Sequence, residues 1–164
     1  MEAIINKSAT FNGPLETGVR LVIILNSSFP KNYDIQRLTA LDYLLVHTSI
    51  LGGPNDLHPQ TPIKTPLTQV RRKIIQNAVS LLISRNIISQ NISPQGIYYS
   101  AGESSDFFVN SFRTSYLKGL DERAKWLNQY FKNFTDREFE TKMNTILEDW
   151  ITEFQENDFN LKKA

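Results

Sequence analysis

Hydrophobic residues recur at helical spacing after Pro14 and then run without a break from Leu21 to Leu25. Such a run fits either a buried helix or a strand, and the i, i+4 continuation of the pattern favours a helix. Proline is well tolerated at the first helical position, so Pro14 marks the start. Phe29-Pro30 marks the end, because a residue that precedes proline disfavours the helical conformation. We therefore predict a central buried helix here.

A second helix is predicted after Asp34, whose carboxylate suits the N-cap position. Leu38, Leu41 and Leu45 form its apolar stripe, and the Gly-Gly-Pro sequence at 52–54 is expected to stop it. Residues 52–66 then contain four prolines and two glycines, which exclude helix and sheet. Long connections of this kind in compact domains are more often functional than idle.

A third helix is predicted from Thr65-Pro66 to Arg85-Asn86. Its expected inward face consists of Val70, Ile74, Ala78, Leu81 and Leu82. Two short strands, at 87–92 and 97–99, flank a Ser-Pro-Gln-Gly turn at 93–96, where proline and glycine suit a type I turn. Three helices followed by a β-hairpin is the element order of a winged helix-turn-helix domain.

Two long helices are predicted after the hairpin. The apolar face of the first carries Phe108, Phe112, Tyr116, Leu120, Leu127 and Phe131, with Gly119 as a weak point. Thr135 and Glu138 form a capping box that opens the second, whose apolar face carries Phe139, Met143, Ile146, Leu147, Trp150 and Phe154. We interpret these faces as core packing. The alternative is that part of them docks a partner or a second copy.

The predicted fold class is therefore mainly α, with a winged helix-turn-helix-like domain that carries a β-hairpin wing, followed by two long C-terminal helices. The boundaries we expect are an N-terminal arm at 1–12, the winged-helix-like domain at 13–100 and the C-terminal helical pair at 101–164. At 40% apolar residues the chain has enough material for a core, and it is not disordered.

The charge balance differs between the two parts of the chain. Residues 1–100 hold nine Lys/Arg and five Asp/Glu, a net +4, whereas residues 101–164 hold nine and twelve, a net −3. This difference fits DNA near one end and a protein partner near the other, and it equally fits an ordinary solvated surface. No apolar run is long enough for a bilayer span or placed for a signal peptide, so we expect a cytoplasmic protein.

Catalytic chemistry is sparse in this sequence. Residues 13–18 imitate the first six positions of a phosphate-binding loop, but Val19 and Arg20 stand where the motif needs Lys and Ser/Thr. His47 and His58 are the only histidines, and neither has further metal ligands at short spacing. Without cysteine there is no disulfide and no thiolate metal site. We expect no catalytic residue, no metal and no cofactor.

Three basic residues open the third helix, where a recognition helix would enter the major groove of DNA: Arg71, Arg72 and Lys73. Arginine can bond phosphates or read guanine. The tip of the hairpin carries no Lys or Arg, whereas DNA-binding wings usually add basic charge. A winged helix that binds protein is therefore favoured, and a DNA-binding transcription regulator of the winged-helix type remains the alternative.

Several short motifs together resemble one known family. In order they are Phe11–Gly18 with Arg20, Asp34–Leu38, Leu41–His47, Gly52–Pro54, Leu57–Pro59 and Val70–Arg72. Joined in this order, and with the resemblance running over about residues 10–155, they resemble the second class of middle components of ABC three-component systems, which are related to the Lamassu anti-phage systems.

This resemblance implies a non-enzymatic adaptor that links an SMC/Rad50-like ABC ATPase to an effector, often a nuclease, in a prokaryotic anti-phage or anti-plasmid defence complex. The ATPase would supply the nucleotide chemistry and most of the DNA sensing. No membrane contact is implied. DNA would be contacted through the complex, with Arg71, Arg72 and Lys73 neutralising phosphates beside the ATPase.

The candidate partner-binding residues match the family pattern and lack an obvious core role: Glu16, Arg20, Arg37, Asp42, Gly52, Gly53 and His58. A loop of Gly, Pro and His between two helices needs a reason to be ordered, and a docked partner would supply one. The alternative is that Gly52 and Gly53 only shape the turn while the charges pair within the chain, as Asp42 would with Arg20 or Arg37.

Overall fold

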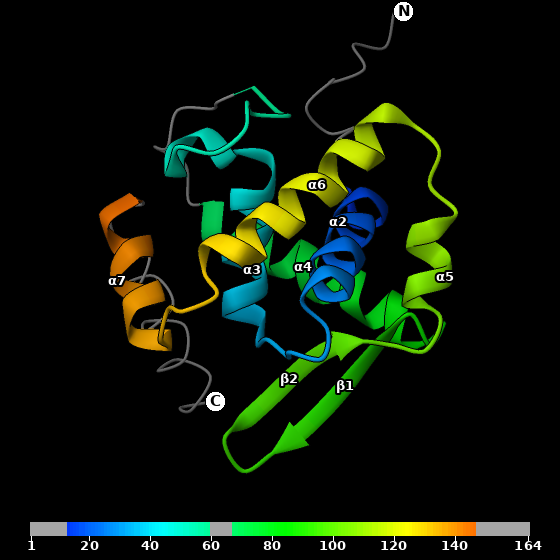
Figure 1. Ribbon diagram of the computed structural model, residues 1–164. Coiled ribbons are helices and arrows are strands. Elements are labelled where there is room, and N and C mark those ends of the chain that lie inside the picture. Colours follow the sequence, from blue (N-terminus) through cyan, green and yellow to red (C-terminus); the bar gives the residue numbers. More distant parts are fainter. Residues whose placement is uncertain (1–12, 60–66, 147–164) are drawn as a thin grey trace, which may run out of the picture.

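The computed structural model describes residues 13–59 and 67–146 (Figure 1). The predicted arm at 1–12, the predicted helix start at Thr65-Pro66 and the predicted end of the last helix beyond residue 146 lie outside the described residues. Within them, helices surround a hydrophobic core and a two-stranded antiparallel β-hairpin projects from one end. The predicted fold class, mainly α with a wing-like hairpin followed by C-terminal helices, is confirmed.

The central element is α2 (Pro14–Ser28), with proline at its start as predicted. It contacts α3, α4, α5, α6 and β2, so it is surrounded by the rest of the fold (Figure 1). Every residue from Leu21 to Leu25 is buried, which explains a hydrophobic run without a polar face. Gly18 lies directly against α4, since a Cβ there would stand 3.2 Å from Cδ1 of Leu82. The preference for helix over strand is confirmed.

The second helix, α3 (Ile35–Val46), is capped as predicted: Oδ1 of Asp34 accepts a hydrogen bond from the backbone N–H of Arg37 at 2.7 Å. It ends earlier than the sequence indicated. A 3₁₀-helix, η1 (Thr48–Leu51), follows at once and ends at Gly52, which has φ +74°. Glycine adopts this left-handed conformation without steric cost, so it terminates the short helix rather than the long one.

The third helix, α4 (Leu67–Ile83), buries a face slightly different from the predicted one. Leu81 is 45% exposed, whereas Ile75 and Val79 are buried together with Leu82. The buried positions follow the spacing i, i+4, i+7, and Leu81 lies just outside that stripe. The inward orientation predicted for Leu81 is therefore wrong.

The hairpin consists of β1 (Ile88–Ser93) and β2 (Gly96–Ala101), which pair antiparallel without a bulge. The predicted strands and turn are confirmed, and β2 runs two residues further than expected. The outer edge of β2 is held at its middle by Tyr33: its N–H donates to the carbonyl of Tyr99 at 2.9 Å, and the Tyr99 N–H donates back at 2.8 Å. The base of the hairpin is thereby fixed, while its tip extends beyond the helices (Figure 1).

The long helix expected after the hairpin is two helices. They are α5 (Ser105–Asn110) and α6 (Ser115–Tyr130), separated by a short break. Thr114 ends the break as the N-cap of α6, because its hydroxyl accepts a hydrogen bond from the N–H of Leu117 at 3.3 Å. The aromatic spacing continued across this cap, so periodicity alone did not reveal the interruption.

The last described helix is α7 (Asp136–Ile146), and its predicted capping box is confirmed. The Thr135 hydroxyl accepts from the N–H of Glu138 at 3.2 Å, and the Glu138 carboxylate accepts from the N–H of Thr135 at 2.7 Å. Phe139 and Met143 are buried as expected. No described helix is long and apolar enough to cross a membrane.

Candidate functional site

A buried carboxylate joins three helices at the centre of the molecule. Asp42 of α3 is fully buried, and its Oδ1 accepts a hydrogen bond from Nε of Arg20 in α2 at 2.6 Å. Its Oδ2 accepts from Nη2 of Arg20 at 3.2 Å and from Nε of Arg71 in α4 at 3.0 Å. Nη2 of Arg20 also donates to the hydroxyl of Thr17 at 3.1 Å. The three charged side chains therefore act as a bracket between α2, α3 and α4.

The arginines keep this carboxylate ionised. Burial by itself would raise the pKa of Asp42, but Arg20 and Arg71 outweigh burial and hold the pKa below its usual range. The carboxylate in turn raises the pKa of Arg20, although burial opposes that change. A lone catalytic acid would need the opposite shift, so this geometry describes a structural ion pair rather than an acid–base group.

Further contacts connect Arg20 to the loop after α3 through Tyr116 and His58. The hydroxyl of Tyr116, on α6, bonds to Arg20 and lies 2.7 Å from Nε2 of His58. Because an arginine only donates, the Tyr116 oxygen accepts from Arg20 and its hydrogen is left for His58. Burial, helped by the charge of Arg20, lowers the pKa of His58 to about 4, so the imidazole is neutral at pH 7.

The other histidine, His47, follows the last residue of α3. Nδ1 of His47 stands 3.5 Å from Oδ2 of Asp56, and its ring lies 4.7 Å from that of Tyr43. Oδ1 of Asp56 accepts from the N–H of Ser49 at 3.0 Å. Burial lowers the pKa of His47, despite the carboxylate nearby. Both histidines are therefore uncharged at neutral pH: His58 bonds to Tyr116, whereas His47 packs against Tyr43.

The loop that carries His58 is docked on α6. Gly53 lies against the indole of Trp126, where a Cβ would come within 2.6 Å of the ring. Nη2 of Arg123 donates to the carbonyl of Asn55 at 2.6 Å. Together with the bond from Tyr116 to His58, these contacts fix the described part of the loop, residues 52–59, on α6 without a bound partner. They agree with the alternative in which the glycines shape the turn and the charges pair within the chain.

Arg37 belongs to a separate cluster at the end of the molecule where α7 begins. Its guanidinium carbon lies 3.3 Å from the centre of the Phe139 ring, which is a close cation–π contact. Nη1 stands 3.7 Å from a carboxylate oxygen of Asp136. Burial lowers the pKa of Arg37, although the side chain remains charged. The expectation that Asp42 pairs with Arg20 or Arg37 is resolved in favour of Arg20.

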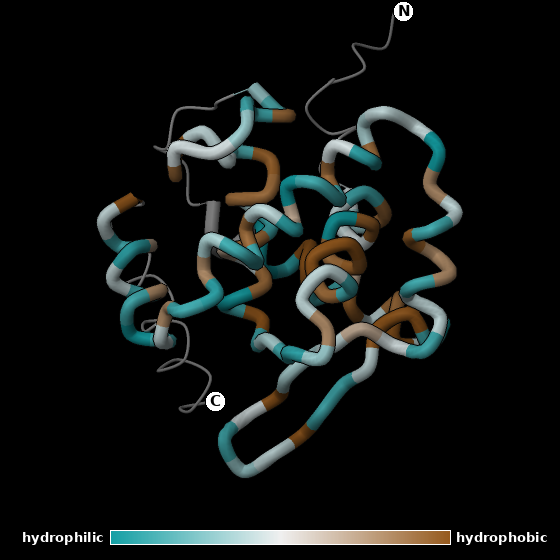
Figure 2. The backbone as a smooth tube through the Cα atoms, in the orientation of Figure 1, coloured by the Kyte–Doolittle hydropathy of each residue, from teal (hydrophilic) through white to brown (hydrophobic). Residues whose placement is uncertain are grey.

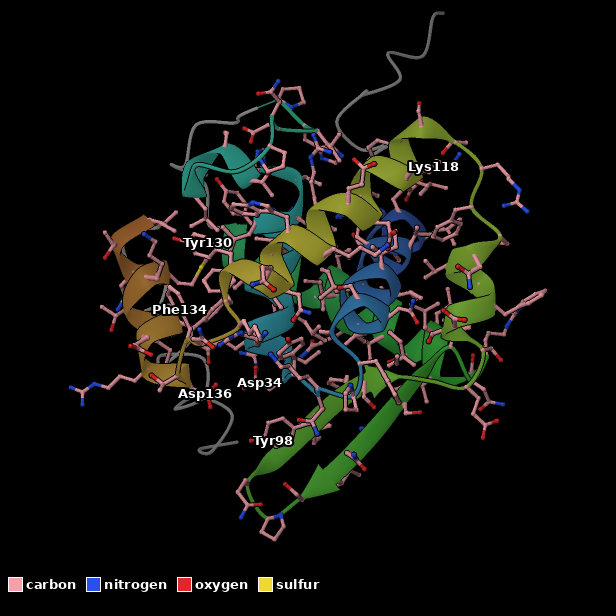
Figure 3. The ribbon with its side chains drawn as sticks, in the orientation of Figure 1. Asp34, Tyr98, Lys118, Tyr130, Phe134 and Asp136 are labelled. Atoms are coloured by element: carbon pink, nitrogen blue, oxygen red, sulfur yellow. The ribbon has the colours of Figure 1, made fainter. Side chains whose placement is uncertain are left out.

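Two grooves flank this cluster. One of about 460 Å³ runs between the end of α2, α6 and the turn before α7, and it includes Phe134 and Asp136. The other, of about 220 Å³, lies between α3, α7 and β2, and it includes Asp34, Tyr98 and Asp136. Figure 3 shows these labelled side chains along the side of the molecule that faces α7. Polar and aromatic groups mix in both grooves.

The remaining predicted residues fall in different places. Glu16 is half-buried on the first turn of α2. Arg72 is half-buried and Lys73 exposed on α4. The structure thus brings Arg20, Asp42, His58 and Arg71 together, while the other residues assigned to partner or DNA contact are dispersed. The roles assigned to all of them remain predictions.

Sequence reasoning missed several members of the network. Thr17, Asp56, Tyr116 and Trp126 each make at least one of the contacts described above, but they were assigned to core packing or not singled out. Tyr116 lies on an apolar helical stripe, and its hydroxyl was the signal that a polar partner had to exist. In the described part of the chain, no group of three or more His, Cys, Asp or Glu side chains could hold a metal ion.

The chain has no significant match among curated proteins or among solved structures. Residues 10–153 match one family, whose description is ABC-three component (ABC-3C) system Middle Component 2. The match spans most of the 164 residues and includes every element described above. The chain therefore belongs to the Middle Component 2 family of ABC three-component systems.

Proposed function

We propose that this chain is a non-enzymatic adaptor, which links an SMC/Rad50-like ABC ATPase to an effector, often a nuclease, in a cytoplasmic Lamassu-like anti-phage or anti-plasmid complex. The family match over residues 10–153 carries the proposal, because a middle component of a three-component system works between two other components. A shared scaffold raises the effective concentration of the two proteins that it holds.

The chemistry of the described residues supports an adaptor rather than an enzyme. The ionisable side chains at the centre are paired with one another: Asp42 with two arginines, and Tyr116 with His58. A nucleophile or general base needs a reactive group that is left accessible to substrate. Nucleotide chemistry would then come from the ATPase, in agreement with Val19 and Arg20 at the phosphate-loop positions.

A winged-helix transcription regulator is the second candidate, and the basic residues of α4 are its basis. Two observations favour the adaptor. Arg71, the first of these residues, is engaged by Asp42, with a side chain only 13% exposed. The wing contains no charged side chain at all between residues 88 and 101, so it offers nothing to neutralise phosphates.

Co-expression with the ABC ATPase and the effector of the same system, followed by size-exclusion chromatography in mild salt, tests the adaptor. We expect one complex that contains all three chains. Effector activity should be lost when the middle component is omitted. Elution of the chain as a free monomer, with full effector activity in its absence, would refute the proposal.

A gel shift on random duplex DNA separates the adaptor from the regulator. Nanomolar, sequence-dependent binding by the isolated chain would favour the regulator. Weak binding that disappears with added salt would favour a subunit that touches phosphates only within the complex. In that complex, replacing the exposed Lys73 by Glu should weaken DNA binding without changing the thermal stability of the chain.

A further inference from the structure

The hairpin extends a hydrophobic face beyond the helical body. Side chains alternate along a strand, so one face of the hairpin carries the register pairs Ile88–Ala101, Gln90–Tyr99 and Ile92–Ile97. At the base Ile88 is 2% exposed, whereas at the tip Ile92 is 78% and Ile97 is 45% exposed. Figure 2 shows hydrophobic residues on both strands outside the body. The same face is core at one end and open surface at the other.

The hydrogen bonds of the base define which backbone groups of β1 point outward. Both backbone groups of Tyr99 bond to Tyr33 on the far side of β2, so they do not bond to Gln90 opposite. Antiparallel pairs alternate between bonded and non-bonded, so Ile92 also directs its N–H and C=O away from β2. Among the described residues, no other element bonds to the backbone of Gln90 or Ile92.

This edge lacks the features that usually protect an exposed strand. Monomeric proteins guard such edges with charged side chains, a proline or a bulge. β1 pairs with β2 in unbroken register, and its sequence ISQNIS has neither charge nor proline. The free edge is therefore ready to pair with another strand that is itself uncharged and extended.

We propose that β1 accepts an extended, uncharged strand of another subunit of the three-component complex. The strand bonds to the outward backbone groups of Gln90 and Ile92, and its apolar side chains on the same face of the sheet lie beside Ile92. This inference rests on the proposed adaptor function and names one of its contact surfaces. A second copy of the chain fits less well, because Ile88 is inside the body and two β1 strands would overlap only at their tips.

The strand register allows a substitution that removes an outward backbone N–H of β1 and leaves the hydrogen bonds within the hairpin intact. In Gln90→Pro the lost N–H is one that points away from β2, so the hairpin keeps its own hydrogen bonds. Ile92→Lys places a charge on the proposed contact face. The matched control is Asn91→Lys, which is in the same strand and also exposed, but on the opposite face. Thermal melts of the isolated variants check that each is folded.

The measurement is the affinity of each variant for the separate ATPase and effector subunits. We expect Gln90→Pro and Ile92→Lys to weaken binding to one of them at least about tenfold, as loss of a central contact does. Asn91→Lys should stay within about twofold. Unchanged affinity of both test variants for both subunits overturns the proposal, and so does a concentration-dependent dimer of the wild-type chain that the same variants abolish.

Hydrogen exchange resolved to single amides adds a signature specific to strand addition. The amides of Gln90 and Ile92 should exchange fast in the free chain and slowly in the complex, while those of Ser89 and Asn91 are protected in both. Equal exchange of Gln90 and Ile92 in the two states contradicts strand addition. If the three chains assemble and this protection is absent, the hairpin proposal fails alone. If they never assemble, the adaptor function and this inference fail together.

Discussion

Replacing Asp42 by Asn removes the charge on which the central bracket depends, while it keeps the size of the side chain. The carboxylate accepts from Arg20 at Oδ1 and from both arginines at Oδ2. An amide has only one oxygen, so one arginine then faces an N–H group instead of an acceptor. Arg20, which is 1% exposed, is left as a buried cation without its counter-charge.

Removal of one partner of a buried ion pair costs about 3–5 kcal/mol, because the remaining charge stays desolvated. That is a large part of the roughly 5–15 kcal/mol by which a typical domain is stable. For a chain of this size each kcal/mol lowers Tm by about 2–4 °C, so we expect a fall of about 6–20 °C. Urea titration and thermal melts followed by far-UV circular dichroism measure both quantities.

Two variants make this prediction specific. Asp121→Asn removes a charge from the exposed pair with Lys125 and should cost under about 0.5 kcal/mol. The triple variant Arg20→Met, Asp42→Leu, Arg71→Met replaces the whole bracket by apolar side chains and should recover most of the lost stability. An Asp42→Asn protein within about 1 kcal/mol of wild type would refute the reasoning.

Two further predictions concern the loop docked on α6. The pKa of His58 is about 4 in the folded chain, so the unfolded chain takes up a proton first and stability falls between about pH 6.5 and 4. In His58→Gln, urea titrations should show a smaller loss of stability over this pH range, and the loss that remains is due to buried His47. An unchanged loss would contradict the assignment of the effect to His58. Gly53→Ala forces the Trp126 indole to move and should cost about 1–3 kcal/mol by urea titration. Trp126→Phe in the same chain should reduce that cost, and equal costs in the two backgrounds would contradict the contact.

Local signals in the sequence predicted most of the helix ends and the hairpin. Pro14 acts through its own restricted backbone. Asp34 and the Thr135–Glu138 box act through hydrogen bonds within a few residues, so a single stretch of sequence reveals all three signals. The break before α6 was missed because aromatic spacing continued across Thr114. Tertiary packing, rather than local sequence, decides such cases.

The members of the central network are far apart in the sequence and meet only in the folded chain, so the sequence predicted only part of the network. Asp42 and Arg20 were paired correctly because both stand on predicted buried helices. The second arginine and Tyr116 come from α4 and α6, far along the chain, and no spacing rule connects them. Arg71 is an example. Its position at the start of a helix suggested a DNA-binding role, whereas in the structure it pairs with the carboxylate of Asp42.

The burial of α2 on all sides has a mechanical consequence. Five elements rest on this one helix, among them β2 of the hairpin and α6, which carries the docked loop. Packed interiors resist gradual deformation, so a displacement at one of these surfaces is transmitted to the others without being absorbed between them. We therefore expect strain applied at the base of the hairpin to reach α6 through α2.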